Sequence, residues 1–399
     1  MERSRYLVLT LVLGALTALP PFSTDTSLPA MPAMADGLGT SQGAIQLTLS
    51  AYFFGGALGQ VVIGPLADRF GRKPVLMLGL LVYVVASLGC AFAGSVEMLM
   101  VMRFLQGSTT ATGRILPRAI ARDMFDREEG ARLLSYMMVV GGIGPIVAPI
   151  LGGHLSGWFG WQAVFVYMTG YGVLAMILSA LWLRESLPAE HRIPLHPPIM
   201  ARNFLMILTD RTFLSYGACV VCTQAGLFAF LSGSSSALIR FMGETPQQFG
   251  FDFAMVMVGG IVFNAIAGRL VGRLGLDRLL AAGAVLAAVA GLFMAALGWG
   301  GIDRVWAIVA PMCAYMAAYA LVVPTATAGA LSPFPRLAGT AASFLGFLQT
   351  VFSAAVTMVL GLIDDTTQIA MVTAVALMGT GILVSRLALV RPLRRRAAT

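Results

Sequence analysis

Long apolar segments separated by short polar ones follow one another along the whole chain. An α-helix needs roughly 20 residues to cross a bilayer. Segments near that length lie at residues 6–30, 43–63, 74–93, 96–117, 132–153, 161–183, 210–232, 248–270, 279–299, 304–330, 337–362 and 367–389. An outer-membrane barrel would show runs of roughly 10 residues alternating apolar and polar positions, and such runs are absent. The pattern predicts an all-α polytopic membrane protein with twelve transmembrane helices.

A polar segment near the middle divides these helices into two groups of six. The segment reads RESLPAEHRIPLHPPIMARN and occupies residues 184–203. GPLADRFGRKPVLMLG, from Gly64, and GRLVGRLGLDRLLAAG, from Gly268, occupy equivalent places in the two groups and share six identical positions. Repeats of this kind are common in transporters. We expect an N-terminal six-helix bundle at 1–183, a cytoplasmic linker at 184–209 and a C-terminal six-helix bundle at 210–399.

The composition supports a lipid environment. Hydrophobic residues make up 58% of the chain and charged residues 11%, whereas soluble domains carry about 25% charged residues. The mean hydropathy is +0.84. The net charge of +8 could indicate nucleic-acid binding, but the basic residues gather in alternate loops, and the opposite loops hold only Arg240 and Arg304. This bias places both termini in the cytoplasm, and we expect no nucleic-acid partner.

Residues typical of enzymes and metal sites are poorly placed for such roles. Cys219 and Cys222 have CxxC spacing, but they lie in an apolar segment, where thiols on one helix face are the simpler interpretation. His154 falls at a helix end, and His191 and His196 fall in the linker. No ATP-binding G-x-x-x-x-G-K-[ST] loop occurs. We therefore expect no enzyme, no metal, no cofactor and no ATP-driven pump.

Two charged residues interrupt apolar segments. Asp25 follows Pro20 and Pro21 in the first segment, and Arg103 lies several residues inside the fourth. A charge in hydrocarbon costs several kcal/mol unless it is paired, hydrated or neutralised, and a guanidinium cannot lose its proton there. We expect the prolines to break the helix before Asp25. Asp25 is then either a protonatable group facing a cavity or a cap of a helix end.

The segment GPLADRFGRKP is expected to form a short loop, with Pro74 in the first turn of the next helix. Its order, G-x-L-x-D-R-x-G-R-K, resembles the signature loop of the major facilitator superfamily. The resemblance implies that Asp68 lies beside a helix N-terminus in the other half and helps to lock one access state, within a network of arginines. The residues concerned are Gly64, Asp68, Arg69, Gly71 and Arg72.

The fourth segment contains RFLQG, which resembles the family's R-x-x-Q-G pattern, associated with proton coupling. The alternative is that Arg103 only hydrogen-bonds backbone carbonyls and holds the bundle together. Gly107, Thr110, Arg114 and Arg118 follow at helical spacing, so a polar stripe extends along the same face toward the cytoplasm. The family usually has an apolar residue where Arg114 stands. Arg114 is therefore either a substrate contact or a side chain reaching for the membrane interface.

The fifth segment contains GGIGPIVAPILGG, in which small residues four apart offer a face for close helix packing. Its prolines favour a bend. The order resembles the motif of the drug:proton antiporter branch, although an ordinary kinked packing helix would also explain it. The motif residues are Gly141, Gly144, Pro145, Pro149 and Gly152.

Residues 20–190 resemble the Bcr/CflA group of bacterial drug exporters. STDTSLPAMP, RAIARD, GWQAVF and RESLP carry this resemblance, with Ser27 standing where the group usually has tyrosine. It implies a monomeric inner-membrane antiporter that exchanges protons for lipophilic drugs such as amphenicols. The proton gradient would supply the energy, and Asp25 and Arg103 would couple it to transport.

A substrate cavity is expected between the halves, near the bilayer midplane. Its candidate lining residues can equally serve in packing. They are Tyr52, Arg114, Tyr216, Gln224, Phe228, Tyr315 and Tyr319. Two other functions remain open: export or symport of a metabolite, and passive facilitation.

Overall fold

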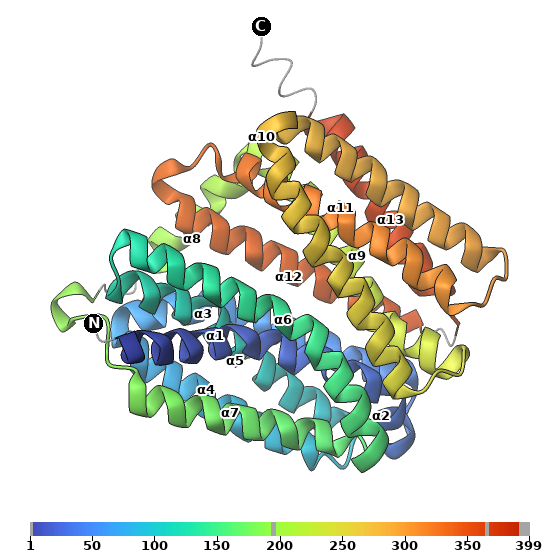
Figure 1. Cartoon of the computed structure of the whole chain (residues 1–399), viewed down its shortest axis with the longest axis horizontal. Coiled ribbons are helices and arrows are strands. Elements are labelled where there is room, and N and C mark those ends of the chain that lie inside the picture. The colour runs from blue at the N-terminus through green and yellow to red at the C-terminus, as the bar shows by residue number, and fades with distance from the viewer. Residues whose placement is uncertain (1–2, 193–196, 364–366, 391–399) are drawn as a thin grey trace, which may run out of the picture. The chain divides into compact units, whose positions relative to one another are not determined.

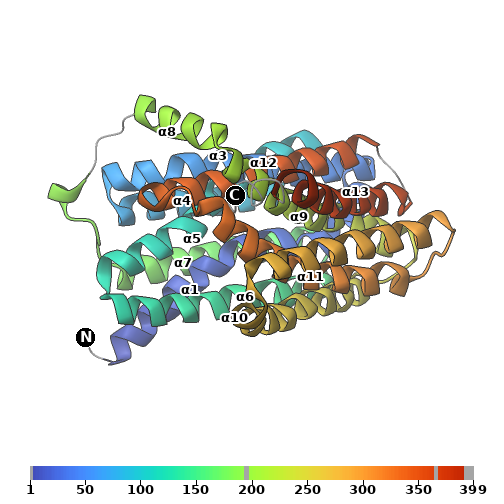
Figure 2. The same ribbon diagram turned by 90° about the horizontal axis from the view of Figure 1, so that it is seen from above.

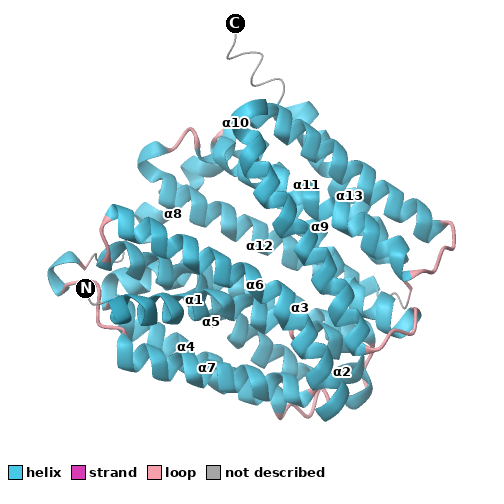
Figure 3. Cartoon of the chain, viewed as in Figure 1, coloured by secondary structure: helices cyan, strands magenta, loops and turns pink. Residues whose placement is uncertain are grey.

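The computed structural model describes residues 3–192, 197–363 and 367–390. Every regular element in this part of the chain is a helix (Figure 3), which agrees with the expected all-α class. The chain divides into two compact units. The first contains Met1–Leu195 with Thr245–Gly250, and the second contains His196–Glu244 with Phe251–Thr399. The expected cytoplasmic tail beyond residue 390 lies outside the described residues.

The first unit is a bundle around α1 and α5 (Figure 1). α1 packs against α5, α6 and α7, while α5 also packs against α3 and α4. These contacts bury the α1 face that carries Leu9, Leu13 and Leu16. The helices are α1 (Arg3–Asp25), α2 (Met31–Gly37), α3 (Gln42–Phe70), α4 (Arg72–Ala91), α5 (Val96–Met124), α6 (Arg127–Phe159) and α7 (Gln162–Trp182).

Glycines bring α3 and α5 into direct backbone contact. A Cβ atom at Gly55 would overlap the Phe104 carbonyl oxygen, and one at Gly107 would overlap the Tyr52 carbonyl oxygen. Small residues allow such close approach in membranes, where van der Waals packing drives helix association. The contact fixes one face of α5 beside Tyr52.

In the second unit, α9 packs against α11, α12 and α13 (Figure 2). α9 ends in a π-helical turn, Ser236–Phe241. α10 contains two of the expected spans, which join at Gly275, where φ is +76°. The helices are α8 (Pro197–Thr209), α9 (Arg211–Ser235), α10 (Pro246–Trp299), α11 (Val305–Leu331), α12 (Ala338–Ile363) and α13 (Ile369–Ser385). The expected linker thus contains a helix, α8, which packs against α12.

Eleven helical segments of the described residues are long and apolar enough to cross a membrane. α5 is not among them, although its 29 residues are sufficient for a crossing. Arg103, Arg114 and the polar residues between them lower its hydropathy. With α5, the described residues contain the twelve expected spans.

The expected loop at Gly64–Pro74 is helical over most of its length, so this expectation was wrong. α3 continues to Phe70 and α4 begins at Arg72, which leaves Gly71 alone to reverse the chain. Gly71 has φ +102°, a conformation that favours glycine. A run of charged residues marks the end of an apolar segment and does not require the helix to end.

Candidate functional site

α1 continues through Pro20 and Pro21 to Asp25, so the expected break before Asp25 is absent. A side-chain hydroxyl binds a carbonyl oxygen of this turn: the Ser23 hydroxyl donates to Leu19 O at 2.7 Å. Such bonds help a helix to accommodate prolines inside a membrane protein.

Asp25 is the last residue of α1, and only 5% of its surface is exposed. The Thr24 hydroxyl donates to Asp25 Oδ1 at 2.8 Å. Among the described residues, no basic side chain, including that of Arg103, lies within ion-pair distance of this carboxylate. Asp25 is therefore a buried acid whose charge no neighbouring arginine offsets.

Arg103 is 2% exposed and binds neutral acceptors. Its Nη1 donates to Ser23 O at 3.0 Å and to Gln106 Oε1 at 2.8 Å. Its Nη2 donates to the Ser27 hydroxyl at 3.1 Å. The guanidinium is thus fixed against the end of α1 on both sides of Asp25.

Two aromatic rings cover the same guanidinium. The Arg103 carbon Cζ lies 4.6 Å from the centre of the Tyr52 ring and 5.7 Å from that of Phe165. Cation–π attraction stabilises a desolvated cation. Tyr52 itself is 3% exposed, and its hydroxyl lies 3.5 Å from Pro20 O. The structure therefore brings Tyr52, Arg103 and Asp25 together in the first unit.

Sequence reasoning did not identify Ser27 as a partner of Arg103. The Ser27 hydroxyl accepts from Arg103 and donates to Thr24 O at 2.7 Å. The available signal was the departure from the tyrosine of the Bcr/CflA group at this position. A serine fills both hydrogen-bonding roles in a small volume.

The antiporter-motif helix, α6, lies against α1 near Asp25. A Cβ atom at Gly144 would approach Pro21 Cγ to 2.9 Å, and one at Gly152 would overlap the Thr26 carbonyl oxygen. Only glycine permits this approach. Gly141 also faces α1, since an added Cβ atom there would lie 3.3 Å from Thr17 Cγ2. α6 remains one helix, Arg127–Phe159, through both of its prolines.

The remaining cavity candidates fall into different environments. Arg114 is exposed on α5. In the second unit, the Tyr319 hydroxyl donates to Gln224 Oε1 at 2.7 Å, and both residues are half-buried. Phe228 is also half-buried. These four side chains keep a surface that a ligand could contact.

Two tyrosines among the candidates are packing residues in this structure. Tyr315 is fully buried, and its hydroxyl donates to Thr223 O at 3.2 Å. Tyr216 is 6% exposed and covers Gly329 of α11. Neither side chain offers surface to a ligand in this conformation.

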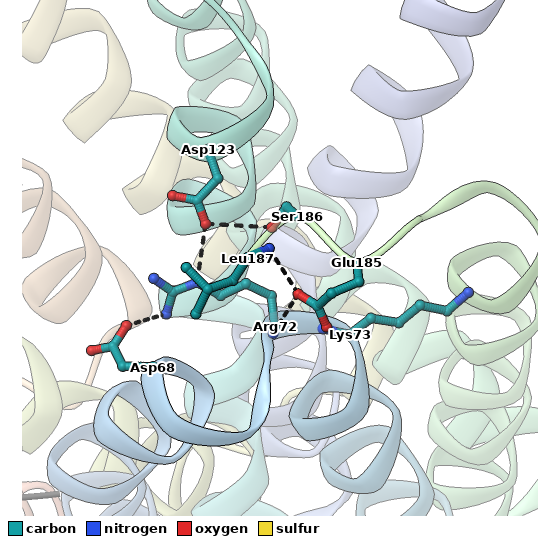
Figure 4. Close-up of polar contacts among 7 residues, drawn as sticks. All are labelled: Asp68, Arg72, Lys73, Asp123, Glu185, Ser186 and Leu187. Carbon is teal, nitrogen blue, oxygen red and sulfur yellow. Dashed lines mark hydrogen bonds and ion pairs between the residues drawn. The ribbon is translucent and has the colours of Figure 1, made fainter. Parts of the chain in front are cut away.

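Arg72 is the centre of an ionic network at the α3–α4 junction (Figure 4). Its Nη1 lies 2.6 Å from Asp68 Oδ1, and its Nε donates to Asp123 Oδ2 at 3.1 Å. Arg69 lies outside this network, with its guanidinium carbon 5.1 Å from the Phe70 ring centre. Of the two expected arginines, Arg72 alone binds these carboxylates.

Glu185 joins the same junction to the segment after α7 (Figure 4). Its carboxylate accepts from the backbone N–H groups of Arg72 at 2.9 Å and Lys73 at 3.2 Å, and from that of Leu187 at 2.9 Å. A carboxylate at a helix N-terminus satisfies unpaired donors and the helix dipole. Sequence reasoning did not identify Glu185 or Asp123 as members of this network, although Glu185 lies in the RESLP segment and Asp123 in the RAIARD segment.

No group of three or more His, Cys, Asp or Glu side chains in the described residues could hold a metal ion. The described cysteines are unpaired thiols, with Cys90 and Cys219 buried. The end of α1 thus brings together one buried acid, Asp25, and one buried cation, Arg103, which is held by hydrogen bonds.

Comparisons with known proteins agree with this architecture. Residues 13–358 match the model of the Major Facilitator Superfamily. A bicyclomycin resistance protein homolog of Haemophilus influenzae is 32% identical over 345 residues, 86% of each chain. A chloramphenicol resistance protein of Pseudomonas aeruginosa is 30% identical over 333 residues, which cover 83% of this chain and 78% of that protein. The crystal structure of a D-xylose–proton symporter has a TM-score of 0.75 at 15% identity, covering 95% of this chain and 97% of that one.

The fold and these similarities define a multi-span helical transporter of small molecules. The chain belongs to the major facilitator superfamily.

Proposed function

We propose that this protein exports small lipophilic drugs from the cytoplasm in exchange for protons. The observation that carries the proposal is the Asp25 carboxyl group, buried at the end of α1 with no ion-pair partner among the described residues. The names of two relatives, for resistance to bicyclomycin and to chloramphenicol, support drugs as substrates.

Asp25 is the proton carrier in this mechanism. An ionised carboxylate in a buried membrane position is costly unless it is paired, hydrated or protonated. In the closed environment at the end of α1, a bound proton removes that cost. When the site opens to water, hydration stabilises the ion and the proton leaves. Alternating exposure to the two sides of the membrane therefore moves protons in one direction while substrate moves in the other.

Arg103 keeps its place during this cycle. Its hydrogen bonds go to Ser23 O, Gln106 and Ser27, all of them neutral groups that do not titrate near neutral pH. The arginine therefore orders the end of α1 in both protonation states.

The network around Arg72 serves as the conformational lock. Arg72, Asp68 and Asp123 join α3, α4 and α5 at one end of the first unit, and Glu185 adds the segment after α7. These contacts hold the ends of α3, α4 and α5 together and thereby stabilise one access state. The proton gradient is the energy source, no cofactor takes part, and a single chain is the working unit. The protein acts in the bacterial inner membrane with both termini in the cytoplasm.

Inside-out vesicles with an acidic interior provide the test. A pH-sensitive dye reports loss of the gradient after addition of chloramphenicol. We expect the drug to dissipate the gradient with the wild type and with Asp36→Asn, but not with Asp25→Asn. Asp36 is an exposed acid of the same span and is the matched control. Equal proton loss with Asp25→Asn and the wild type would exclude Asp25 as the carrier.

A further inference from the structure

The polar face of α5 continues beyond Arg103 to a second arginine, Arg114, and then to Arg118. Arg103, Gly107, Thr110 and Arg114 recur every three or four residues and share one helix face. The face is buried at Arg103, which is 2% exposed, and at Thr110, which is 5% exposed. At Arg114 it becomes exposed, ten residues before the helix ends at Met124.

This face is not the apolar outer face of α5. Leu105 is 38% exposed and precedes Arg114 by nine residues, which is two and a half turns at about 3.6 residues per turn. The two side chains therefore leave α5 in opposite directions. In addition, Arg103, which shares the polar face with Arg114, lies over the Tyr52 ring and hydrogen-bonds the end of α1 on both sides of Asp25. Arg114 thus leaves α5 on the side of the helix that carries Arg103.

Positive charge exceeds negative charge on this side of the first unit. Asp25 lies twelve residues before the end of its span, Tyr6–Gly37. The other acids of these helices lie within three residues of a span end or of an end of α5: Asp36, Asp68, Glu97, Asp123, Glu128 and Glu129. With Asp25 ionised the net charge of the three inner groups is +1, and with Asp25 protonated it is +2.

We propose that Arg114 is the substrate-selecting residue of this transporter and binds oxygen acceptors or an anionic group of the substrate. The proposal rests on the proposed export function and names its substrate class: neutral, acceptor-rich molecules and organic anions, with cationic drugs excluded. A guanidinium presents a planar fork of N–H donors that matches a carboxylate or a nitro group. A cationic drug would meet a positive site in both protonation states of Asp25, and Coulomb repulsion is strong away from bulk water.

Probes that share a scaffold but differ in charge provide the experiment. Proteoliposomes holding the full chain are loaded with unlabelled chloramphenicol, and exchange with radiolabelled chloramphenicol is followed without a proton gradient. Chloramphenicol hemisuccinate, which adds a carboxylate, and tetraphenylphosphonium, a lipophilic cation, are the competitors. The variants are Arg114→Gln and Arg114→Lys. Arg118→Gln is the matched control, since Arg118 is an exposed arginine one turn further along α5.

The expected result is a charge preference that depends on Arg114. In the wild type and in Arg118→Gln, the hemisuccinate competes at least as well as chloramphenicol, and the cation competes about a hundredfold more weakly. In Arg114→Gln, the hemisuccinate competes about tenfold more weakly than in the wild type, and competition by chloramphenicol changes less. The cation competes better in this variant than in the wild type. Arg114→Lys restores part of the anion preference.

Three results would overturn the inference. The first is competition by the cation and the hemisuccinate at equal concentrations in the wild type. The second is an Arg114→Gln protein that binds all three probes more weakly by the same factor, which would assign Arg114 to packing. The third is an Arg114→Gln protein whose preference among the three probes equals that of the wild type. If folded wild-type protein exchanges none of the three probes, the proposed drug export itself is wrong, and that outcome is distinct from exchange without charge preference.

Discussion

The Arg103 guanidinium donates a hydrogen bond to the Ser27 hydroxyl at 3.1 Å, two residues beyond Asp25, and forms no ion pair with the Asp25 carboxylate. The acid and the cation are thus held near the same turn of chain by separate sets of partners. A salt bridge between them would have to break in each transport cycle. In the proposed mechanism, this separation lets Asp25 bind and release a proton while Arg103 remains in place.

Ser27 should be important for holding Arg103. Ser27→Ala leaves a buried N–H of the guanidinium without its acceptor, which costs about 1–3 kcal/mol. We expect lower thermal stability in detergent and at least a tenfold loss of drug transport. Thr26→Val is the control, because the neighbouring Thr26 hydroxyl is buried without a hydrogen-bond partner, so removing it should not lower the stability. Equal effects of both substitutions would contradict the assigned role.

Gly152 should tolerate no side chain. The added Cβ of Gly152→Ala would overlap the Thr26 carbonyl oxygen and push α6 away from the turn that carries Asp25. Overpacking of this kind costs about 1–3 kcal/mol, and transport should fall with it. Gly170→Ala on α7 is the comparison, since nothing lies within 4 Å of its added Cβ. Thermal unfolding with matched transport assays would separate the two, and an unaffected Gly152→Ala would refute the close contact.

Glu185 should stabilise the junction between α3 and α4. Glu185→Gln removes the negative charge that accepts from the N-terminal amides of α4, and a charge at an exposed helix N-terminus contributes about 0.3–1 kcal/mol. We expect faster hydrogen exchange at Arg72 and Lys73 and lower transport. Glu190→Gln, on the same segment, should leave exchange at these amides unchanged. Protection that persists in Glu185→Gln would show that other groups hold the junction.

Glu244 should make stability depend on pH. Burial, with a further contribution from the nearby Asp252 carboxyl, raises the pKa of Glu244 from its usual 4.5 to about 8. The folded protein therefore keeps a proton that the unfolded chain loses above about pH 4.5. The contribution of Glu244 to the free energy of unfolding is therefore fully present below about pH 4.5 and is lost as the pH rises towards 8.

Glu244→Gln should flatten this dependence. At pH 8.5 the variant should be more stable than the wild type by on the order of 1 kcal/mol or less, because the half-exposed position screens the repulsion. At pH 4.5 the two proteins should unfold at nearly the same temperature. Thermal unfolding between pH 4.5 and 9 would check this, and parallel curves would contradict the raised pKa.

The helical class and the positions of the spans could be predicted from the sequence. Apolar segments of bilayer length permit few alternatives, and even α5 was recognised despite Arg103 and Arg114. The ends of helices were less predictable, because charge and proline mark changes of environment and not necessarily breaks. α1 therefore continued through Pro20 and Pro21, and α3 extended to Phe70.

The partners of the candidate residues were harder to predict than the residues themselves. Asp25, Arg103 and Arg72 were identified from charge in apolar segments and from motif order. Glu185 could not be assigned to Arg72, because 113 residues separate them and only the packing of α4 against α7 brings them together. The acceptors of Arg103 include a backbone oxygen, Ser23 O, and a backbone atom leaves no trace in residue identity.

The central claim is that Asp25 carries the proton that is exchanged for substrate, and proton release on drug binding measures this exchange directly. Purified protein in weakly buffered detergent solution receives chloramphenicol while a pH indicator records the change. The account predicts that the wild type and Asp36→Asn release protons in proportion to drug bound, and that Asp25→Asn binds the drug without release. Proton release from Asp25→Asn equal to that of the wild type would contradict the account.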